Sequence, residues 1–342
     1  MKTKQIVFTK KDTAELLDAE YLPPKAGEVT VRLCYTAISA GTEKANLTGV
    51  SNIGIGISEH APAVFPRMLG YSGAGIVEAV GDGVTSVRPG DRGIVFWGKH
   101  VGHITISENN VIRIEDERIP LQEAAILFIS TFPAAAIRKT RLEFGESSLV
   151  MGLGILGQFA VKLLRAAGAY PIVAADPVEN RRALALQYGA DFALDPTAPD
   201  FAETVKRITH GGAKTAIEVT GLGKGLDQAL DCMARFGRVA LLGCTRSSNF
   251  SIDYYSKVHG PGITLVGAHT QARPGQESYP GYWTHPDEIR GLLGLCSGGR
   301  FLLSDLIHEI DSPAEAPEVY TRLATDPNFP IGVLFDWSRI EA

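Results

Sequence analysis

Cysteine is scarce in this chain, and what there is lies scattered. The 342 residues include four, Cys34, Cys232, Cys244 and Cys296, and no two of them form a CxxC pair. This spacing excludes a zinc-finger site and a small disulfide-rich secreted scaffold. We therefore expect reduced thiols and a cytoplasmic protein.

Two other features are missing. No early segment is apolar for long enough to be a signal peptide or a membrane span. The chain also has no basic patch with interleaved aromatic residues, and its net charge of −5 argues against nucleic acid as a partner. Because 45% of the residues are hydrophobic and 8% aromatic, the composition fits a soluble globular protein of about two domains. We expect a small-molecule substrate and no membrane partner.

What the chain does have is a glycine-rich turn between a strand and a helix. The apolar run 149–151 leads into a turn of sequence GLGILG, residues 152–157. Apolar residues then recur at helical spacing as far as Ala167, and a second apolar run ends on Asp176. Strand, glycine turn, helix, strand and acid, in that order, are typical of a dinucleotide-binding βαβ unit.

Each of these residue types has a physical role in such a unit. Gly152 permits the sharp turn, Gly154 lets a pyrophosphate approach the backbone, and Gly157 lets the helix pack closely on the strand. The N–H groups at the start of the helix then meet the phosphates. Asp176 is placed to reach the ribose hydroxyls, and its charge would repel a 2′-phosphate by about 1 kcal/mol in a wet site and about 4 kcal/mol at lower dielectric. The predicted cofactor is therefore NAD, with Arg181 packed along the adenosine.

The periodicity of the chain changes near residue 148. Residues 1 to about 125 are rich in short strands, among them 28–34, 75–80 and 93–96. From Ser148 onward strands and helices alternate, which predicts a parallel sheet with helices on both faces. The predicted strands are 172–175, 192–194, 215–219, 239–242 and 263–267, and the predicted helices are 179–188, 201–209, 226–235 and 286–295. Ligands of such sheets collect at the carboxyl ends of the strands, here near Gly152, Asp176, Thr220, Gly243 and Ala268.

The ordered motifs resemble the medium-chain dehydrogenase/reductase superfamily over nearly the whole chain. The resemblance rests on the segments 70–75 and 90–92, the GLGILG turn, and the strand ends 218–221 and 237–243. It implies a GroES-like catalytic domain (1–127 and 269–342), a Rossmann NAD-binding domain (128–268) and an active site in the cleft between them. The further cofactor contacts that we predict are Ile155, Leu156, Thr131, Thr220, Gly243, Cys244 and Ala268.

The chain departs from this superfamily at the catalytic zinc. Where its alcohol dehydrogenases have a cysteine, a histidine and a later cysteine or glutamate, this chain has Ala40, Tyr71, and Leu127 or Phe128. Since zinc needs thiolate, imidazole or carboxylate ligands, we predict that no metal is bound. The chain is similar to a zinc-lacking branch that includes bacteriochlorophyllide dehydrogenases and sugar- or cyclitol-related oxidoreductases.

Without a metal, hydroxyl and imidazole groups would have to stabilise the substrate oxygen and move its proton. Thr42 lies where the superfamily has its relay hydroxyl, although a turn threonine often bonds its own backbone instead. Tyr71 takes the former histidine position, or is a buried core tyrosine. His269 follows a strand end near the expected nicotinamide, or stacks in a subunit interface. Glu43 orients the relay, or is a satisfied structural carboxylate, which is the commoner case.

Other candidates have weaker support. His60, His100 and His103 fall in or near loops of the first domain, and two histidines without a third ligand more often occupy solvated positions. Trp97 and Trp283 are either a wall for an apolar or sugar substrate or parts of the core.

The sequence thus predicts an α/β oxidoreductase: a zinc-independent, NAD-dependent alcohol dehydrogenase acting on a polyol, sugar or cyclitol. One alternative is an NAD(P)H-dependent enoyl or quinone reductase, and another is a non-catalytic NADH-binding protein. We expect a homo-oligomer, a dimer or a tetramer, with strand 263–267 as the edge for pairing.

Overall fold

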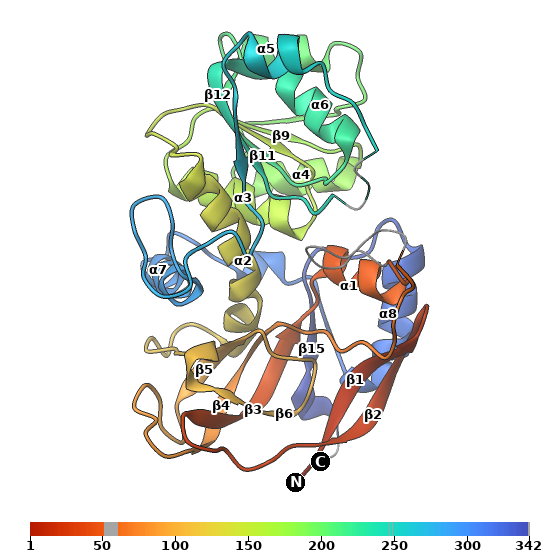
Figure 1. Ribbon diagram of the computed structural model, residues 1–342, viewed down its shortest axis with the longest axis vertical. Helices are drawn as coiled ribbons and strands as arrows, with labels where there is room; N and C mark the ends of the chain where they lie inside the picture. The colour runs from red at the N-terminus through yellow and green to blue at the C-terminus, as the bar shows by residue number, and fades with distance from the viewer. Residues whose placement is uncertain (51–60, 246, 248, 341–342) are drawn as a thin grey trace. The chain divides into compact units, whose positions relative to one another are not determined.

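The structure is a computed structural model that describes residues 1–50, 61–245, 247 and 249–340. The chain forms two compact units, one comprising Met1–Ile129 with Ile289–Ala342 and the other Ser130–Glu288. The first unit thus combines the N-terminal strands with the last described segment of the chain (Figure 1). A β-rich unit together with a unit built on a parallel sheet confirms the predicted α/β fold class.

The first unit is built on a mixed sheet of seven strands. Their order is β14-β15-β3-β4-β5-β7, and β6 also pairs with β3. The strands are β3 (Glu28–Ala37), β4 (Ser72–Val80), β5 (Arg92–Phe96), β6 (His103–Ser107), β7 (Val111–Arg113), β14 (Glu309–Asp311) and β15 (Val333–Asp336). The unit also contains a hairpin, β1 (Lys2–Lys10) and β2 (Thr13–Glu20), and the helices α1 (Ala40–Leu47) and α8 (Ala316–Thr325).

The alternating pattern of β3 explains how this unit packs. Val29, Val31 and Leu33 lie on one face of the strand and are buried in a core shared with α8 and the hairpin. Tyr320 and Phe335 belong to the same core, with their ring centroids 5.9 Å apart. The core therefore ties the early strands to the C-terminal segment of the chain.

The second unit has a six-stranded parallel sheet in the order β10-β9-β8-β11-β12-β13. Its strands are β8 (Ser148–Met151), β9 (Ile172–Ala175), β10 (Phe192–Leu194), β11 (Ala213–Glu218), β12 (Met233–Leu241) and β13 (Thr264–Gly267). Its helices are α3 (Ile155–Ala166), α4 (Glu179–Gln187), α5 (Phe201–Ile208) and α6 (Gly223–Asp231), and α3 and α6 lie on opposite sides of the strands (Figure 1). This order is that of a dinucleotide-binding doubly wound sheet, with its switch point between β8 and β11.

The apolar strands of this sheet account for its position in the core. Residues 149–151 and 172–175 are buried on both faces, as expected for strands covered by helices on each side. Because the strands are parallel, the turns after β8, β9, β11, β12 and β13 meet at one edge of the sheet.

Two predicted boundaries differ from the structure. The helix predicted over 226–235 ends at Asp231, because Met233 already pairs with Ala213 in the sheet. We placed the return to the first domain at residue 269, whereas residues 269–288 cluster with the second unit. Lys139, in α2 (Leu121–Lys139), donates to the carbonyls of Gly267 and Ala272 and so holds this segment there.

The sheet of the second unit ends at β13, which pairs with β12 on its one bonded side. The predicted homo-oligomer would use this edge, and it stays a prediction. None of the helices in the described ranges is long and apolar enough to cross a membrane.

Candidate functional site

The glycine turn after β8 connects directly to the first turn of α3. Gly154 is the N-cap of this helix, and no side chain caps it. An alanine Cβ built at Gly154 meets nothing within 4 Å, so the space before the helix is open at this residue. Uncapped N–H groups facing open space are what an anionic pyrophosphate requires.

The two flanking glycines are needed for different reasons. Gly152 has φ of +94°, which a side chain rarely adopts, and a Cβ there would lie 3.0 Å from Cγ2 of Thr220. A Cβ at Gly157 would lie only 1.9 Å from the carbonyl oxygen of Gly152. Gly157 therefore permits α3 to pack on the turn, as the sequence pattern predicts.

Asp176 is buried at the end of β9 and faces the glycine turn. Its Oδ2 accepts the backbone N–H of Leu153 at 2.8 Å, and its Oδ1 accepts that of Val178 at 2.9 Å. The Arg181 guanidinium lies 3.7 Å from Oδ2. Gln158, which we did not predict, ties the helix to both segments by donating to the carbonyls of Leu153 and Arg181.

The neighbouring turns come close to one another at the same sheet edge. A Cβ at Gly243 would lie 2.3 Å from the nitrogen of Gly221, and one at Gly221 would lie 2.6 Å from the carbonyl oxygen of Cys244. Ala268 follows β13 and donates to the carbonyl of Leu241 at 3.1 Å. The structure therefore gathers most of the predicted cofactor contacts along one edge.

Glu218 organises the turn after β11, and sequence analysis assigned it no role. Its buried carboxylate accepts the hydroxyl of Thr220 and the backbone N–H groups of Thr220 at 2.8 Å and Gly221 at 3.3 Å. Burial raises the pKa of Glu218. The Thr220 hydroxyl, a predicted cofactor contact, is thereby held within the turn.

The other predicted residues of the second unit lie in the middle of α2 and in the segment that follows β13. Thr131 is buried, and its carbonyl accepts from Arg273 at 3.1 Å. Burial lowers the pKa of Arg273 to about 10. His269 is half-buried, and its Nδ1 accepts the N–H of Gln271 at 3.2 Å. The Arg138 guanidinium lies over the Trp283 ring at 3.5 Å, so this tryptophan is engaged by a cation.

Tyr71 lies in the first unit, just before β4, inside an aromatic cluster. Its ring centroid is 5.5 Å from that of Trp97 and 5.9 Å from that of Phe128. Its hydroxyl donates to Oγ of Ser39 at 2.5 Å. Trp97 is 41% exposed and has a left-handed φ of +59°, which is unfavourable for a bulky side chain. Such strain concentrates at functional sites.

Glu43 is fully buried and accepts three hydrogen bonds. Its Oε1 accepts the N–H of Ser39 at 2.9 Å, and its Oε2 accepts Oη of Tyr320 at 2.6 Å. Nε2 of His100 lies 3.1 Å from the same Oε2. Burial and the neighbouring carboxylate raise the pKa of Tyr320 well above its usual value. This geometry matches the structural alternative for Glu43, a satisfied carboxylate.

For His100 the sequence-based expectation was wrong. We expected a solvated loop position, but the side chain is 1% exposed. Its Nδ1 lies 2.7 Å from Oγ1 of Thr36, which also accepts the Trp337 indole N–H at 2.9 Å. The network explains the burial, because both ring nitrogens find partners. His103 is part-exposed and stacks on Tyr21, and His60 lies outside the described residues.

Thr42 is half-buried in α1, one residue before Glu43, and its carbonyl accepts the side-chain amide of Asn46 at 2.9 Å. Within the described part of the chain, no three histidine, cysteine, aspartate or glutamate side chains group in a way that could hold a metal ion.

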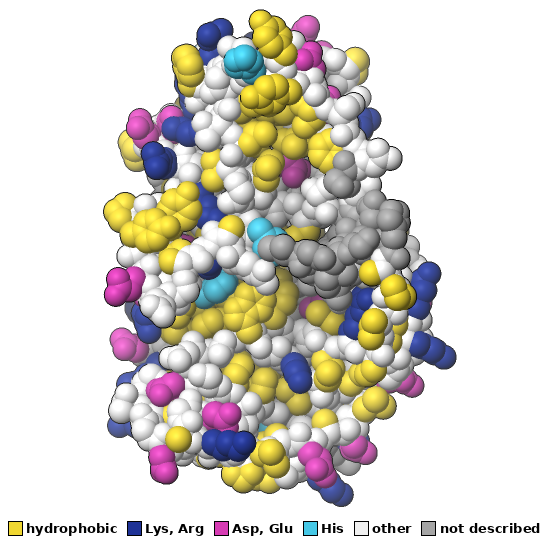
Figure 2. Space-filling model, viewed as in Figure 1, with side chains coloured by type: hydrophobic (Ala, Val, Ile, Leu, Met, Phe, Trp, Pro, Cys, Tyr) yellow, Lys and Arg dark blue, Asp and Glu magenta, His cyan; other side chains and the backbone are white. Residues whose placement is uncertain are grey.

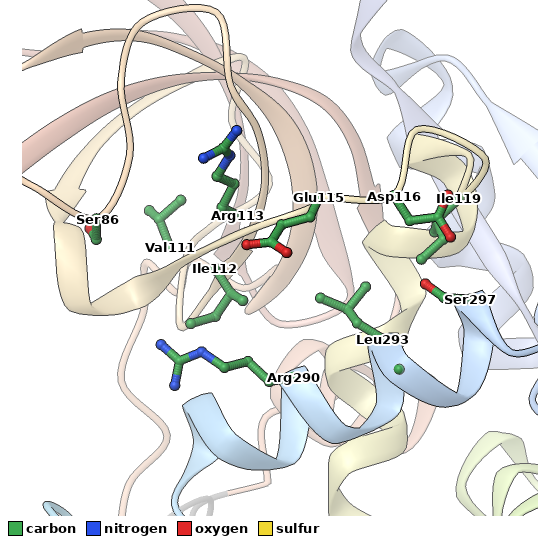
Figure 3. A pocket seen from close by; sticks show the side chains of 11 residues that line it. Ser86, Val111, Ile112, Arg113, Glu115, Asp116, Ile119, Arg290, Leu293 and Ser297 are labelled. Carbon is green, nitrogen blue, oxygen red and sulfur yellow. The ribbon is translucent and has the colours of Figure 1, made fainter.

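The first unit also contains a cavity of about 590 Å³, which is separate from the candidate site residues described above (Figure 3). It lies between the edge strand β7 and the last turns of α7 (His285–Ser297), with Glu115 and Leu293 pointing into it. None of its lining residues is a predicted site residue, so it is not the candidate active site. Among the described residues on the face shown in Figure 2, basic and acidic side chains are interspersed.

Comparisons with known proteins agree with this geometry. Residues 156–285 match the family model described as zinc-binding dehydrogenase. The D-guloside 3-dehydrogenase of Escherichia coli K12 is 26% identical over 337 residues, which cover 93% of this chain and 95% of that protein. The chain is therefore similar to zinc-binding (medium-chain) alcohol dehydrogenases over most of its length.

Solved structures share the fold over almost the whole chain. A short chain alcohol dehydrogenase from E. coli CFT073 in complex with NADH has a TM-score of 0.83 at 18% identity and covers 98% of this chain and 99% of that one. Galactitol-1-phosphate dehydrogenase from E. coli has a TM-score of 0.81 at 18% identity and covers 97% and 99%. The protein is an NAD(P)-dependent dehydrogenase that acts on CH–OH groups.

The two glycines of the turn make a matched pair of variants. Gly157→Ala would lower the free energy of unfolding by about 1–3 kcal/mol, because its Cβ meets backbone that cannot move aside. Gly154→Ala would change it by less than about 1 kcal/mol, because its Cβ enters open space. In an NADH titration Gly154→Ala would bind at least about ten-fold more weakly. Equal losses of stability in denaturant unfolding would contradict this account.

The buried carboxylate of Glu43 gives a second stability prediction. Glu43→Gln would place an amide N–H₂ among groups that donate, and would cost about 1–3 kcal/mol. The matched control is Glu78→Gln, whose exposed carboxylate pairs with Arg32 at 3.1 Å and whose loss would cost less than about 1 kcal/mol. Urea unfolding of the two variants compares them directly, and similar midpoints would contradict the assigned role of Glu43.

Proposed function

We propose that this protein is a zinc-independent, NAD-dependent dehydrogenase of a secondary alcohol on a polyol, sugar or cyclitol. The observation that carries the proposal is the environment of Tyr71. At the position where zinc-dependent relatives have a histidine ligand, a phenol donates to Ser39 and packs against Phe128. The residue at the cysteine position is Ala40, and the later ligand position falls at Leu127 or Phe128.

These side chains do not fit a zinc ion. Zinc in proteins is bound by thiolate, imidazole or carboxylate, whereas this set provides a methyl group, a protonated phenol and hydrocarbon. Histidine and glutamate are nearby, but His100 and Glu43 already bond to each other inside the core of the unit. The proposed reaction therefore uses no metal ion.

The residues of the second unit fit a dinucleotide. The open space at Gly154 and the uncapped start of α3 would hold the pyrophosphate, and Asp176 would face the adenosine ribose. Thr131, Thr220, Gly243, Cys244 and Ala268 are proposed as further contacts, with Ile155 and Leu156 offering backbone N–H groups. Bound NAD would supply the acceptor for the hydride that leaves the carbinol carbon.

The hydroxyl proton of the substrate must leave as the hydride leaves. Tyr71 is proposed as the group that takes this proton in oxidation and returns it to the carbonyl oxygen in reduction. Thr42 and His269 are proposed as hydrogen-bonding groups that assist the transfer. Glu43 holds α1 in place and does not exchange the proton, because its oxygens already accept three donors.

The substrate class is supported by Trp97 and by the relatives. A half-exposed indole next to Tyr71 offers the flat apolar surface on which the C–H face of a sugar ring packs. One relative similar over nearly its whole length is a D-guloside dehydrogenase, and one with the same fold is a galactitol-1-phosphate dehydrogenase.

The proposed function is tested with purified protein, NAD and a panel of polyols, sugars and cyclitols. We expect turnover that survives exhaustive chelation, with metal analysis finding zinc far below one per chain. Tyr71→Phe should lower kcat by about 10²–10⁴-fold with NADH binding retained, since it removes the proposed acid–base group. Stoichiometric zinc required for turnover would contradict the metal-free mechanism. Turnover of enoyl or quinone substrates alone would favour a reductase, and NADH binding without any turnover would favour a non-catalytic protein.

Cofactor preference depends on Asp176. The wild-type protein should bind NADH at least about ten-fold more tightly than NADPH, because the carboxylate repels a 2′-phosphate. Asp176→Ala should reduce this ratio by about ten-fold or more. Asp195→Ala is the control, since its carboxylate bonds Thr197 and faces Arg182 at 3.8 Å. Fluorescence titrations measure the affinities for NADH and NADPH. If the ratio of the two affinities is unchanged in Asp176→Ala, this residue does not select the cofactor.

A further inference from the structure

Ser39 occupies the N-cap of α1 but does not cap it. Serine is favoured at this position because its hydroxyl accepts an N–H from the first turn, which is worth about 0.5–2 kcal/mol. Here no side-chain cap bond forms, and the backbone of Ser39 is at φ −91° and ψ 84°. The hydroxyl is therefore used for something other than the helix.

The hydroxyl of Ser39 faces the phenol of Tyr71. Their oxygens are 2.5 Å apart, and Ser39 is almost fully buried, so water competes little for this bond. A hydroxyl can accept from a phenol and, after rotation about its C–O bond, donate to a phenolate. The same pair can therefore remain bonded before and after the proton leaves Tyr71.

Glu43 holds Ser39 at the required place. It reaches back one turn to accept the N–H of Ser39 at 2.9 Å, which is half of a capping arrangement. Glu43 is itself fixed by Tyr320 and His100 from other parts of the chain. The position of the Ser39 hydroxyl is thus set by a buried network and does not depend on a flexible loop.

We propose that Ser39 is a positioning residue for Tyr71, whose hydroxyl fixes the phenol and stabilises its phenolate form. This inference rests on the proposed function, in which Tyr71 exchanges the substrate proton. In reduction, the phenol O–H bond would break as its proton goes to the carbonyl oxygen, while the carbonyl carbon would receive the hydride that bound NADH would supply. The Ser39 O–H then turns to donate to the phenolate, and the proton is later replaced from solvent.

Aromatic rings and a carboxylate lie beside this pair of hydroxyls. Trp97 and Phe128 pack against Tyr71, and neither ring carries an ionisable group. The Glu43 carboxylate contacts Ser39 through its backbone N–H, so it leaves the serine hydroxyl to the phenol. Next to Glu43 stand His100 and the Tyr320 hydroxyl, which bond to the carboxylate.

The experiment compares Ser39→Ala, Ser39→Thr and Ser72→Ala in the full chain. Ser72 is the matched control, since it is also buried and adjoins Tyr71, but its hydroxyl donates to the carbonyl of Ala125 at 2.6 Å. Ser39→Ala should lower kcat by about 10–100-fold with the KM for NADH unchanged, the effect of losing a hydrogen bond to a charged oxygen. Ser39→Thr should recover most of kcat, because it keeps the hydroxyl. Ser72→Ala should keep the wild-type value.

A second readout needs no turnover. Tyrosinate absorbance is followed with pH in each variant, and the same titration of Tyr71→Phe is subtracted to isolate the step of Tyr71. In Ser39→Ala this step should move about one to two pH units higher, because the phenolate loses its donor. If the dehydrogenase proposal fails, no variant turns over any substrate, yet this titration still tests the pair. An unmoved Tyr71 step, an unchanged kcat in Ser39→Ala, or an equal loss in Ser72→Ala would each overturn the inference.

Discussion

The carboxylate of Glu43 organises the first unit because it is buried among donors from distant parts of the chain. A buried charge is costly unless hydrogen bonds replace its hydration. Glu43 obtains these from the Ser39 backbone, from Tyr320 in α8 and from His100 in the segment after β5. Moving any of these segments would take one donor away from the buried carboxylate, so the network favours keeping the three together.

This constraint reaches the residues that carry the proposed chemistry. Ser39 and Thr42 lie within a few residues of Glu43, and Ser39 bonds Tyr71. Trp97, three residues before His100, packs on the same tyrosine. A metal ion would organise a catalytic centre through its own ligand bonds. In this chain a network of donors around the Glu43 carboxylate orders the segments that carry Ser39, His100 and Tyr320.

The second unit is organised differently, by backbone proximity. Its turns approach so closely that several glycines have no room for a Cβ, and Asp176 and Glu218 satisfy the N–H groups that the turns expose. Gly154, where α3 begins, is an exception, because a Cβ there would meet no atom within 4 Å. Rigid turns around one uncapped helix start make a surface that is formed before any anion arrives.

The sequence by itself determined the fold class, the order of the strands and helices after residue 148, and the glycine turn, because these depend on local periodicity and on residue types with few conformations. It also identified Asp176 as a candidate cofactor contact and Tyr71 as a departure from the zinc-ligand pattern. The roles of His100, Ser39 and Glu218 were decided only by the tertiary structure. His100 and Tyr320 are far from Glu43 in the chain, and no local pattern shows which distant donor will meet a buried carboxylate. The C-terminal boundary of the second unit was also decided only by the tertiary structure. Long-range hydrogen bonds from Lys139 and Arg273 hold residues 269–288 in that unit.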